Sequence, residues 1–258
     1  MFTPQLSFIR KADGGVCARA VVIFVHGITE GTEQFREPAA WAGEMGMDSV
    51  VLSLPGHGGT AGAFARSGRK AWEDCVYEAV ERCRREYDHI FLVGHSMGGL
   101  LSMLAWLHDA ERIAGVVVIG CPLHVWVAGR AVRHILDVRY QPETDDAEVE
   151  AMRHAVNVAP GSTLGYLRWL PCLRDLFAMM RTVRRGLPRL AVPLLVVQGM
   201  RDELVDARRS LQCFRRRVSP EWLQTLELPR STHFLYPPAE WGRLREAMRG
   251  MWTAISGS

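Results

Sequence analysis

Residues 89–106 read HIFLVGHSMGGLLSMLAW. An apolar run ends in the pentad GHSMG at residues 94–98, and a helix-like apolar stretch follows it. This order predicts a strand that turns sharply into a helix with Ser96 on the turn. Such a turn strains the serine backbone and presses strand against helix, so only glycine fits at positions 94 and 98. The Ser96 hydroxyl is then presented at the edge of a sheet, where the helix N-terminus offers free N–H groups.

Two later segments supply the partners that a serine nucleophile needs. A G-x-S-x-G pentad also arises in ordinary serine turns and helix caps, so its partners decide its meaning. Residues 192–198 (VPLLVVQ) predict a short buried strand, and Asp202 follows in the next turn. Residues 226–233 (LELPRSTH) predict a second short strand whose exit loop carries His233. The order Ser96, Asp202, His233 is that of the α/β-hydrolases.

Four motifs extend this resemblance over nearly the whole chain except its middle. The chain resembles α/β-hydrolases and, more narrowly, is similar to the small bacterial carboxylesterases and monoacylglycerol lipases. The matching stretches are FVHGIT (24–29), GHSMGG (94–99), VP leading into QGMRDELV (192–205) and STH (231–233). The family usually has an aromatic residue where Ile28 stands, a glycine where Glu30 stands, and Ser-Gly-His rather than Ser-Thr-His at the end. These departures leave the triad intact and bear on substrate preference.

The triad predicts acyl transfer through Ser96. The hydroxyl would attack an acyl carbonyl while His233 takes its proton and later returns it to the leaving alcohol. Asp202 would hold the imidazole in the right tautomer and stabilise its charged form. Glu203 and Asp206 are competing acids, but Asp202 comes first after the strand and matches the family position.

The resemblance implies an oxyanion hole made by the backbone N–H groups of Ile28 and Met97. It also implies that His26 is a structural residue of the oxyanion loop and that His95 points away from the nucleophile. Candidate substrate-binding residues are His57, Cys121, Phe177 and Met180. The sequence contains no metal-ligand cluster, phosphate-binding glycine loop or dinucleotide fingerprint, so no metal and no cofactor are expected.

Apolar runs that alternate with helix-length segments predict the fold class. The fully apolar character of several runs is typical of strands buried on both faces. We therefore expect an α/β-hydrolase fold with a mostly parallel central sheet flanked by helices. A helix is expected over residues 70–87 and a closing helix over residues 237–252. The predicted strands are residues 20–25, 50–54, 90–93, 116–119, 194–197 and 223–228.

The alternation breaks between residues 122 and 190. Residues 126–136 look helical, residues 143–150 look like a loop or helix start, and an apolar stripe at helical spacing follows. We interpret residues 123–188 as a small helical cap inserted between two parts of the core, residues 1–122 and 189–258. Packing of the stripe onto the core is favoured over substrate contact, although a cap face can do both. The stripe consists of Leu173, Leu176, Phe177 and Met180.

Composition bounds the class of protein. The 258 residues suffice for one large α/β domain, and the six cysteines include no C-x-x-C pair, so core packing is their favoured role. The N-terminal residues lack a signal-peptide pattern and no run reaches membrane-spanning length, which predicts a cytoplasmic protein without stable membrane insertion. A net charge of +3 gives no reason to expect nucleic-acid binding. The basic cluster over residues 168–217 is interpreted as a solvated face rather than a site for anionic lipid or acidic substrate.

These patterns together predict a serine hydrolase that cleaves small-molecule carboxylic esters, as a carboxylesterase or monoacylglycerol lipase does, through an acyl-enzyme on Ser96. Thioesterases, acyltransferases and carbon–carbon bond hydrolases use the same triad and remain alternatives. A non-catalytic ligand-binding member of the fold is an alternative from another class. The oligomeric state is left open.

Overall fold

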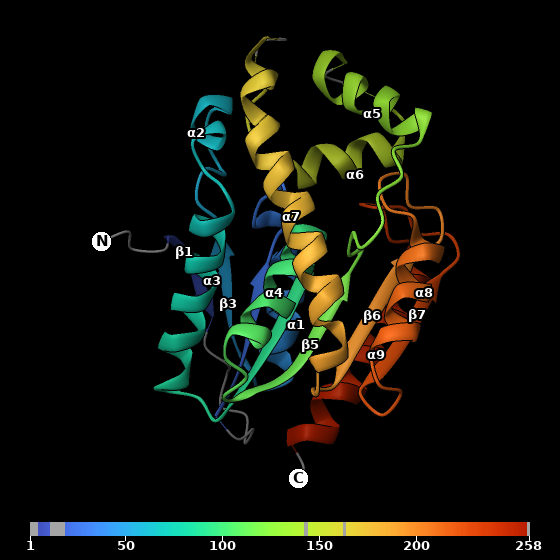
Figure 1. Ribbon diagram of the computed structural model, residues 1–258. Helices are drawn as coiled ribbons and strands as arrows, with labels where there is room; N and C mark the ends of the chain where they lie inside the picture. The colour runs from blue at the N-terminus through green and yellow to red at the C-terminus, as the bar shows by residue number, and fades with distance from the viewer. Residues whose placement is uncertain (1–4, 11–18, 142–143, 162–163, 257–258) are drawn as a thin grey trace.

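A computed structural model describes residues 5–10, 19–141, 144–161 and 164–256. Its seven strands form one sheet in the order β1-β3-β2-β4-β5-β6-β7 (Figure 1). β1 runs antiparallel to β3 and all other neighbours are parallel, which confirms the predicted mostly parallel sheet. The strands are β1 (Gln5–Arg10), β2 (Ala20–Val25), β3 (Asp48–Ser53), β4 (His89–His95), β5 (Ile113–Ile119), β6 (Leu194–Gly199) and β7 (Leu223–Leu228).

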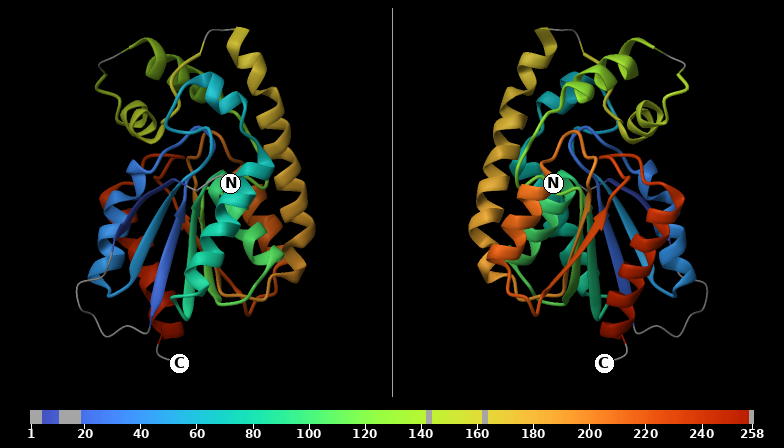
Figure 2. Two further views of the ribbon diagram at one scale, coloured as in Figure 1. Left: turned by 90° about the vertical axis from the view of Figure 1, so that its left-hand side faces the viewer. Right: turned by 90° about the vertical axis from the view of Figure 1, so that its right-hand side faces the viewer.

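Helices cover both faces of this sheet (Figure 2). One face packs against α3 (Arg69–Arg84), α4 (Met97–His108), part of α7 (Leu170–Gly186) and α8 (Ala207–Arg217). The other face packs against α1 (Arg36–Glu44) and α9 (Pro238–Ser256). Because successive strand side chains point to opposite faces, β2 sends Ile23 into the first core and Phe24 into the second. A strand buried on both sides must be apolar throughout, as its sequence predicts.

The predicted helices are present with small shifts at their ends. The helix expected over residues 70–87 is α3, and the closing helix expected over 237–252 is α9, which runs four residues further. Two short elements near the C-terminal edge of the sheet complete the core, η1 (Glu33–Phe35) and α2 (Ala61–Ala65). Cys17 lies outside the described residues, and the other five cysteines are free thiols. Among the described helices, none is long and apolar enough to span a bilayer.

The segment between β5 and β6 is helical in its described part. It contains α5 (Gly129–Tyr140), α6 (Ala147–Ala155), η2 (Leu164–Trp169), α7 and η3 (Leu187–Arg189). α5 and α6 lie beyond the C-terminal edge of the sheet, whereas α7 descends along the side of the core (Figure 1). The second half of α7 buries Met179 and Val183 in the same cluster as Leu104 of α4. That half of the helix is therefore part of the core layer, although it lies inside the residues 123–188 that we interpret as a cap.

The sequence predicts a helix that begins at residue 126, but α5 begins three residues later, at Gly129. Backbone hydrogen bonds to the loop after β6 explain the difference. Val125 forms a β-bridge with Val205, and the Trp126 N–H donates to the Leu204 carbonyl at 2.9 Å. Residues with an extended backbone partner cannot also form the first turn of a helix.

Candidate active site

Ser96 lies on a sharp turn between β4, which ends at His95, and α4, which begins at Met97. Its φ angle of 51° lies in the left-handed region that non-glycine residues rarely adopt. A Cβ atom at Gly94 would overlap the backbone of Gly98, and a Cβ atom at Gly98 would overlap the carbonyl group of Val25. The two glycines of the pentad are therefore steric requirements of this turn.

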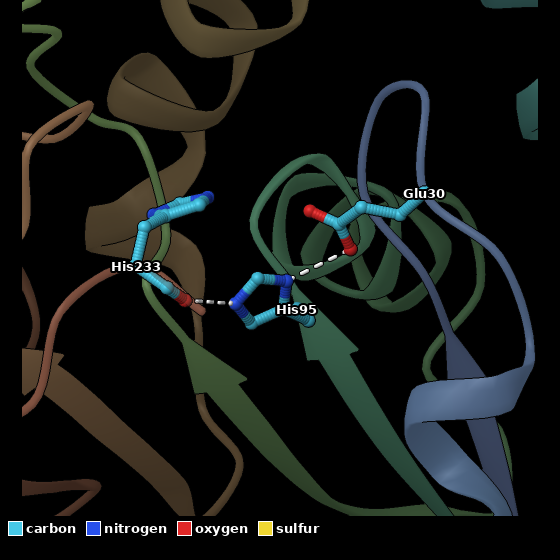
Figure 3. Close-up of side chains that lie close together, drawn as sticks. All are labelled: Glu30, His95 and His233. Atoms are coloured by element: carbon cyan, nitrogen blue, oxygen red, sulfur yellow. Dashed lines mark hydrogen bonds and ion pairs between the residues drawn. The ribbon is translucent and has the colours of Figure 1, made fainter. Parts of the chain in front are cut away.

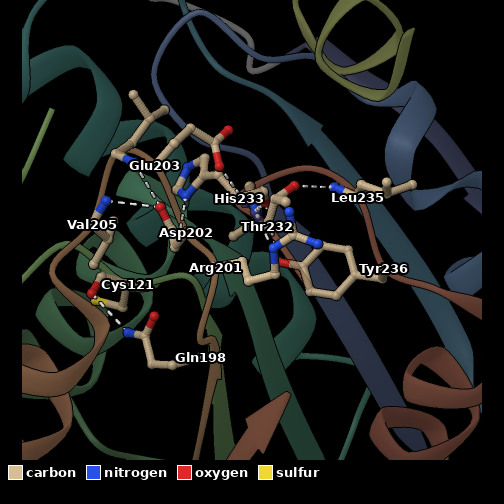
Figure 4. A network of polar contacts seen from close by, with 12 residues as sticks. Cys121, Gln198, Arg201, Asp202, Glu203, Val205, Thr232, His233, Leu235 and Tyr236 are labelled. Atoms are coloured by element: carbon tan, nitrogen blue, oxygen red, sulfur yellow. Dashed lines mark hydrogen bonds and ion pairs between the residues drawn. The ribbon is translucent and has the colours of Figure 1, made fainter. Parts of the chain in front are cut away.

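His233 and Asp202 form a buried pair (Figure 4), and the His233 carbonyl lies 3.0 Å from Nε2 of His95, the residue before Ser96. The Nδ1 atom of His233 lies 2.7 Å from Oδ2 of Asp202, and both side chains are at most 2% exposed. The other carboxylate oxygen, Oδ1, accepts N–H bonds from Leu204 and Val205, each at 2.8 Å. Because both oxygens are held, the carboxylate fixes the orientation of the imidazole ring.

The competing acids have different partners. Asp206 caps the N-terminus of α8, where its Oδ1 accepts the N–H of Arg209 at 3.0 Å. Glu203 accepts the backbone N–H of His233 at 3.2 Å, and its carboxylate lies 3.8 Å from the guanidinium of Arg130. Of the three acids, Asp202 alone hydrogen-bonds the His233 ring.

Surrounding carboxylates favour the protonated form of His233. Burial on its own disfavours the charged ring, but Asp202, assisted by Glu30 and Glu203, outweighs burial and raises the pKa of His233 to about 9. A raised pKa means that the ring keeps its proton to a higher pH than an ordinary histidine does.

Residues 26–31, the predicted oxyanion loop, are held in place by histidines and by backbone pairing. Thr29 has a φ angle of 61°, and its N–H donates to Nε2 of His57 at 3.2 Å. His26 accepts the N–H of Leu54 at 3.0 Å through its own Nε2. Burial lowers the pKa of His57 to about 3, which keeps that ring neutral and able to accept. Among the described residues, the backbone N–H groups of Ile28 and Met97 have no hydrogen-bond partner.

Glu30 is a site residue whose role sequence reasoning missed. It drew notice only as a departure from the glycine usual in the family. Its side chain is 2% exposed, and its Oε2 lies 2.8 Å from Nδ1 of His95 (Figure 3). Burial opposes the charge, but the adjoining His95 outweighs it and lowers the pKa of Glu30 to about 2.

Glu30, His95 and His233 place three possible metal-ligand atoms within 4.8 Å of one another. Both ring nitrogens of His95 already have hydrogen-bond partners: Nδ1 lies by Glu30 and Nε2 by the His233 carbonyl. A cation bound by His95 would have to break one of these two bonds, so we assign no metal to this cluster.

Comparison with known proteins places the chain. A family model described as "Serine aminopeptidase, S33" (Hydrolase_4) matches residues 16–235. The chain belongs to this family. Among curated relatives of this S33-family chain, human monoglyceride lipase is 26% identical over 208 residues, which cover 74% of this chain and 67% of the relative. Phospholipase YtpA from Bacillus subtilis is 26% identical over 230 residues, covering 79% of this chain and 83% of the relative.

Solved structures support the fold of this S33-family chain. A soluble variant of monoglyceride lipase from Saccharomyces cerevisiae superposes with a TM-score of 0.73 at 15% identity, over 94% of this chain and 89% of that one. A structure from work on LipS and LipT, two metagenome-derived lipolytic enzymes, also gives 0.73, at 20% identity over 98% of this chain and 100% of that one. At such low identity the likeness shows the α/β-hydrolase fold alone.

The four candidate substrate-binding residues of the S33-family chain lie in different environments. His57 is 9% exposed and bonded to the oxyanion loop, as described above. Cys121 is fully buried and Met180 is 3% exposed, and both belong to the main core cluster. Phe177 is 45% exposed on α7. The burial of Met180 favours a role in packing the helix onto the core over a role in substrate contact. The side chain of Phe177 is exposed, so a ligand could contact it.

A cavity of about 620 Å³ lies between residues of η1, α1, α6 and α9. Core residues His95, Phe234 and Tyr236 line it together with Ala155 of α6. Neither Ser96 nor Ile28 contributes to its walls. We therefore do not take this cavity as the site where an acyl group would meet Ser96.

Proposed function

We propose that this protein is a serine hydrolase that cleaves carboxylic esters through an acyl-enzyme on Ser96. The observation that carries the proposal is the buried Asp202–His233 pair at 2.7 Å, whose histidine backbone is bonded to His95, the neighbour of Ser96 in the chain. The parallel strands β4, β6 and β7 end shortly before Ser96, Asp202 and His233, so the three residues follow the same edge of the sheet, which supports their acting as nucleophile, orienting acid and base.

In the first half-reaction, Oγ of Ser96 attacks the ester carbonyl and His233 accepts the hydroxyl proton. The unpartnered N–H groups of Ile28 and Met97 are the proposed donors to the oxyanion. Collapse of the tetrahedral intermediate breaks the bond to the alcohol, which leaves with the proton from His233. In the second half-reaction, a water molecule gives a proton to His233 and attacks the acyl carbonyl; collapse of this intermediate breaks the bond to Oγ of Ser96, which takes the proton back from His233, and the carboxylic acid is released. Asp202 balances the charge on the ring in both steps.

The names of the relatives suggest the substrate class. Monoglyceride lipase and phospholipase act on esters of lipids, so we propose monoacylglycerols and similar uncharged esters as substrates. The family description names an aminopeptidase, which makes an aminoacyl amide the alternative to test. Thioesters, acyl transfer and carbon–carbon bond cleavage would use the same three residues. We also propose that residues 123–188 act as a cap over the acyl site, except where α7 packs into the core.

A fluorophosphonate probe tests the proposal against a non-catalytic binding role. The probe should label the wild-type protein on Ser96 and leave Ser96→Ala unlabelled. A panel of ester chain lengths, a monoacylglycerol, a thioester and an aminoacyl anilide then separates the substrate classes. Failure of the probe to label, together with no turnover of any panel member, would refute the proposed function.

A further inference from the structure

Glu30 concentrates three hydrogen bonds on one buried oxygen. Its Oε2 accepts the backbone N–H of Gly27 at 2.6 Å, the side-chain amide of Gln34 at 2.8 Å and Nδ1 of His95 at 2.8 Å. Only 1% of the residue is exposed. A buried carboxylate is costly unless it is paired and hydrogen-bonded, so this arrangement is specific to the charged form.

One of these bonds extends to the proposed base. The second nitrogen of the His95 ring, Nε2, lies 3.0 Å from the backbone carbonyl oxygen of His233 (Figure 3). A carbonyl oxygen only accepts, and so does a carboxylate, so both bonds form together only when the ring carries two protons. Glu30 and His95 then form a buried ion pair that holds the main chain of His233. The hydroxyl of Tyr236 donates to the same carbonyl at 3.2 Å.

Another bond reaches the proposed oxyanion hole. Gly27 directly precedes Ile28, whose N–H is a proposed donor, and a Cβ atom at position 27 would overlap the Glu30 carboxylate. The carboxylate therefore fits closely against the loop from the inside. From the other side, the loop pairs with the chain after α6 through a β-bridge between Glu30 and Val156.

We propose that Glu30 is a positioning residue of the active site: its carboxylate fixes the Ile28 loop and, through His95, the main chain of His233. This inference rests on the proposed function. The Glu30 side chain would thereby set the distance between the Ile28 N–H and His233. The rate of a serine hydrolase depends steeply on the relative positions of its oxyanion donors and its base. Glu30 does not contact the reacting atoms itself.

The same carboxylate acts on His233 through its charge. The titratable groups that act on the His233 ring are the carboxylates of Asp202, Glu30 and Glu203, and the His95 ring lies beside it, while the Tyr236 hydroxyl contacts the His233 carbonyl instead. Glu30 is one of the groups that raise the pKa of His233. Removing the charge of Glu30 should therefore lower the pKa of His233. A change that only loosens the packing around Glu30 gives no reason to expect this decrease.

Glu30→Gln tests the proposal with an isosteric side chain that lacks the charge. We expect kcat for an ester to fall roughly tenfold or more with KM changed less than about twofold, because positioning acts on the transition state. The acid limb of kcat/KM against pH should move to lower pH. Glu33→Gln is the matched control, since Glu33 is an exposed carboxylate on the same segment that pairs with Arg36 at the surface. It should behave like the wild type in both measurements.

NMR titration of the histidine rings makes the test independent of any substrate. Glu30→Gln should lower the pKa of His233 relative to the wild type. Unshifted His233 titration with unchanged kcat in Glu30→Gln would overturn the proposal. A loss of kcat with unshifted His233 titration would overturn it too, because it indicates a merely structural role. If the wild type fails to turn over esters, the proposed function falls while the titrations still decide the role of Glu30.

Discussion

Ser96 occupies a backbone conformation that costs on the order of 1–3 kcal/mol for a residue other than glycine. The close packing of Gly94 and Gly98 keeps the serine there. Replacing Ser96 by alanine removes the proposed nucleophile without altering this packing. We expect kcat to fall roughly 10³-fold or more with the fold intact, because only binding and the oxyanion donors would then contribute. Ester hydrolysis and circular dichroism measure the two effects, and activity within about tenfold of wild type would contradict the mechanism.

The acids after β6 provide a matched pair of variants. Asp202→Asn removes the carboxylate that orients His233, so kcat/KM should fall by several orders of magnitude, roughly 10⁴-fold in a comparable triad. Asp206→Asn should have little effect, because asparagine caps a helix about as well as aspartate does. Steady-state kinetics on both variants compares them directly. Equal losses would show that the acid is misassigned.

The surroundings of His233 predict an alkaline pH dependence. A general base acts only when unprotonated, and the pKa of His233 is raised to about 9. Lowering the pH below this value protonates the ring, so kcat/KM should fall about tenfold per pH unit on the acid side. Initial rates from about pH 6 to about pH 10, corrected for spontaneous hydrolysis, test this. A plateau that begins near the ordinary histidine pKa would contradict the raised pKa.

Of the residues predicted from short motifs, Asp202 and His233 form a hydrogen-bonded pair, whereas the role of Glu30 was missed. The serine turn and the order of acid and base follow from local patterns, so a single sequence reveals them. The bond between Glu30 and His95 joins residues 65 positions apart, and no local periodicity encodes it. In the sequence, Glu30 was noticed only because an acidic residue stands where a glycine is usual.

At the scale of elements, α7 shows what helical spacing can and cannot predict. The spacing identified an apolar stripe, but the stripe divides between two environments. Leu176 and Met180 are buried in the core, while Leu173 and Phe177 are 39% and 45% exposed. The spacing of apolar residues identifies the apolar face of a helix. Which residues of that face are buried depends on the neighbouring elements in the tertiary fold.

This division predicts different outcomes for two alanine variants of α7. Met180→Ala should lower the free energy of unfolding by about 2–5 kcal/mol, because it leaves a cavity in the core. Phe177→Ala should leave stability nearly unchanged and alter the preferred acyl length, because each methylene that an acyl chain buries is worth about 0.8 kcal/mol, or roughly fourfold in kcat/KM. Urea denaturation and an ester chain-length series measure the two effects. An unchanged length profile in Phe177→Ala would argue that this face of α7 does not roof the acyl site.

β1 and the start of α5 were mispredicted for a common reason. β1 was not predicted at all, and it exists as an antiparallel partner along the outer edge of β3. The start of α5 is delayed by pairing with the loop after β6. In both cases the backbone conformation depends on pairing with a segment that is distant in the sequence. Local sequence propensity contains no information about such a partner.

At the scale of the whole molecule, backbone hydrogen bonds join described residues of the segment between β5 and β6 to loops of the core, in addition to the packing of α7. Near its start, the Trp126 N–H bonds to Leu204 in the loop that carries Asp202. Near its middle, the Asn157 N–H bonds to Thr29 at 2.8 Å and the Ala159 N–H bonds to Gly59 at 2.9 Å. The described part of the segment therefore contacts both loops on which the proposed chemistry depends.

Hydrogen exchange can test whether these joints stay closed. The amides of Trp126, Asn157 and Ala159 should exchange more slowly than those of α5, because opening them requires the segment to separate from the core. Residue-resolved exchange by NMR or mass spectrometry measures the difference. Faster exchange at these three amides than along α5 would mean that the segment lifts away as a unit.

The backbone pairing of residues 155–159 limits how hydrolases of this type can be recombined. A designer who exchanged the whole insertion for that of another enzyme would also replace the strand-like partner of the oxyanion loop. Such a chimaera could fold well and still turn over slowly. Crossover points placed after residue 159 and before the buried half of α7 would leave the catalytic loops with their native neighbours, and libraries built on those junctions should yield a larger share of active clones.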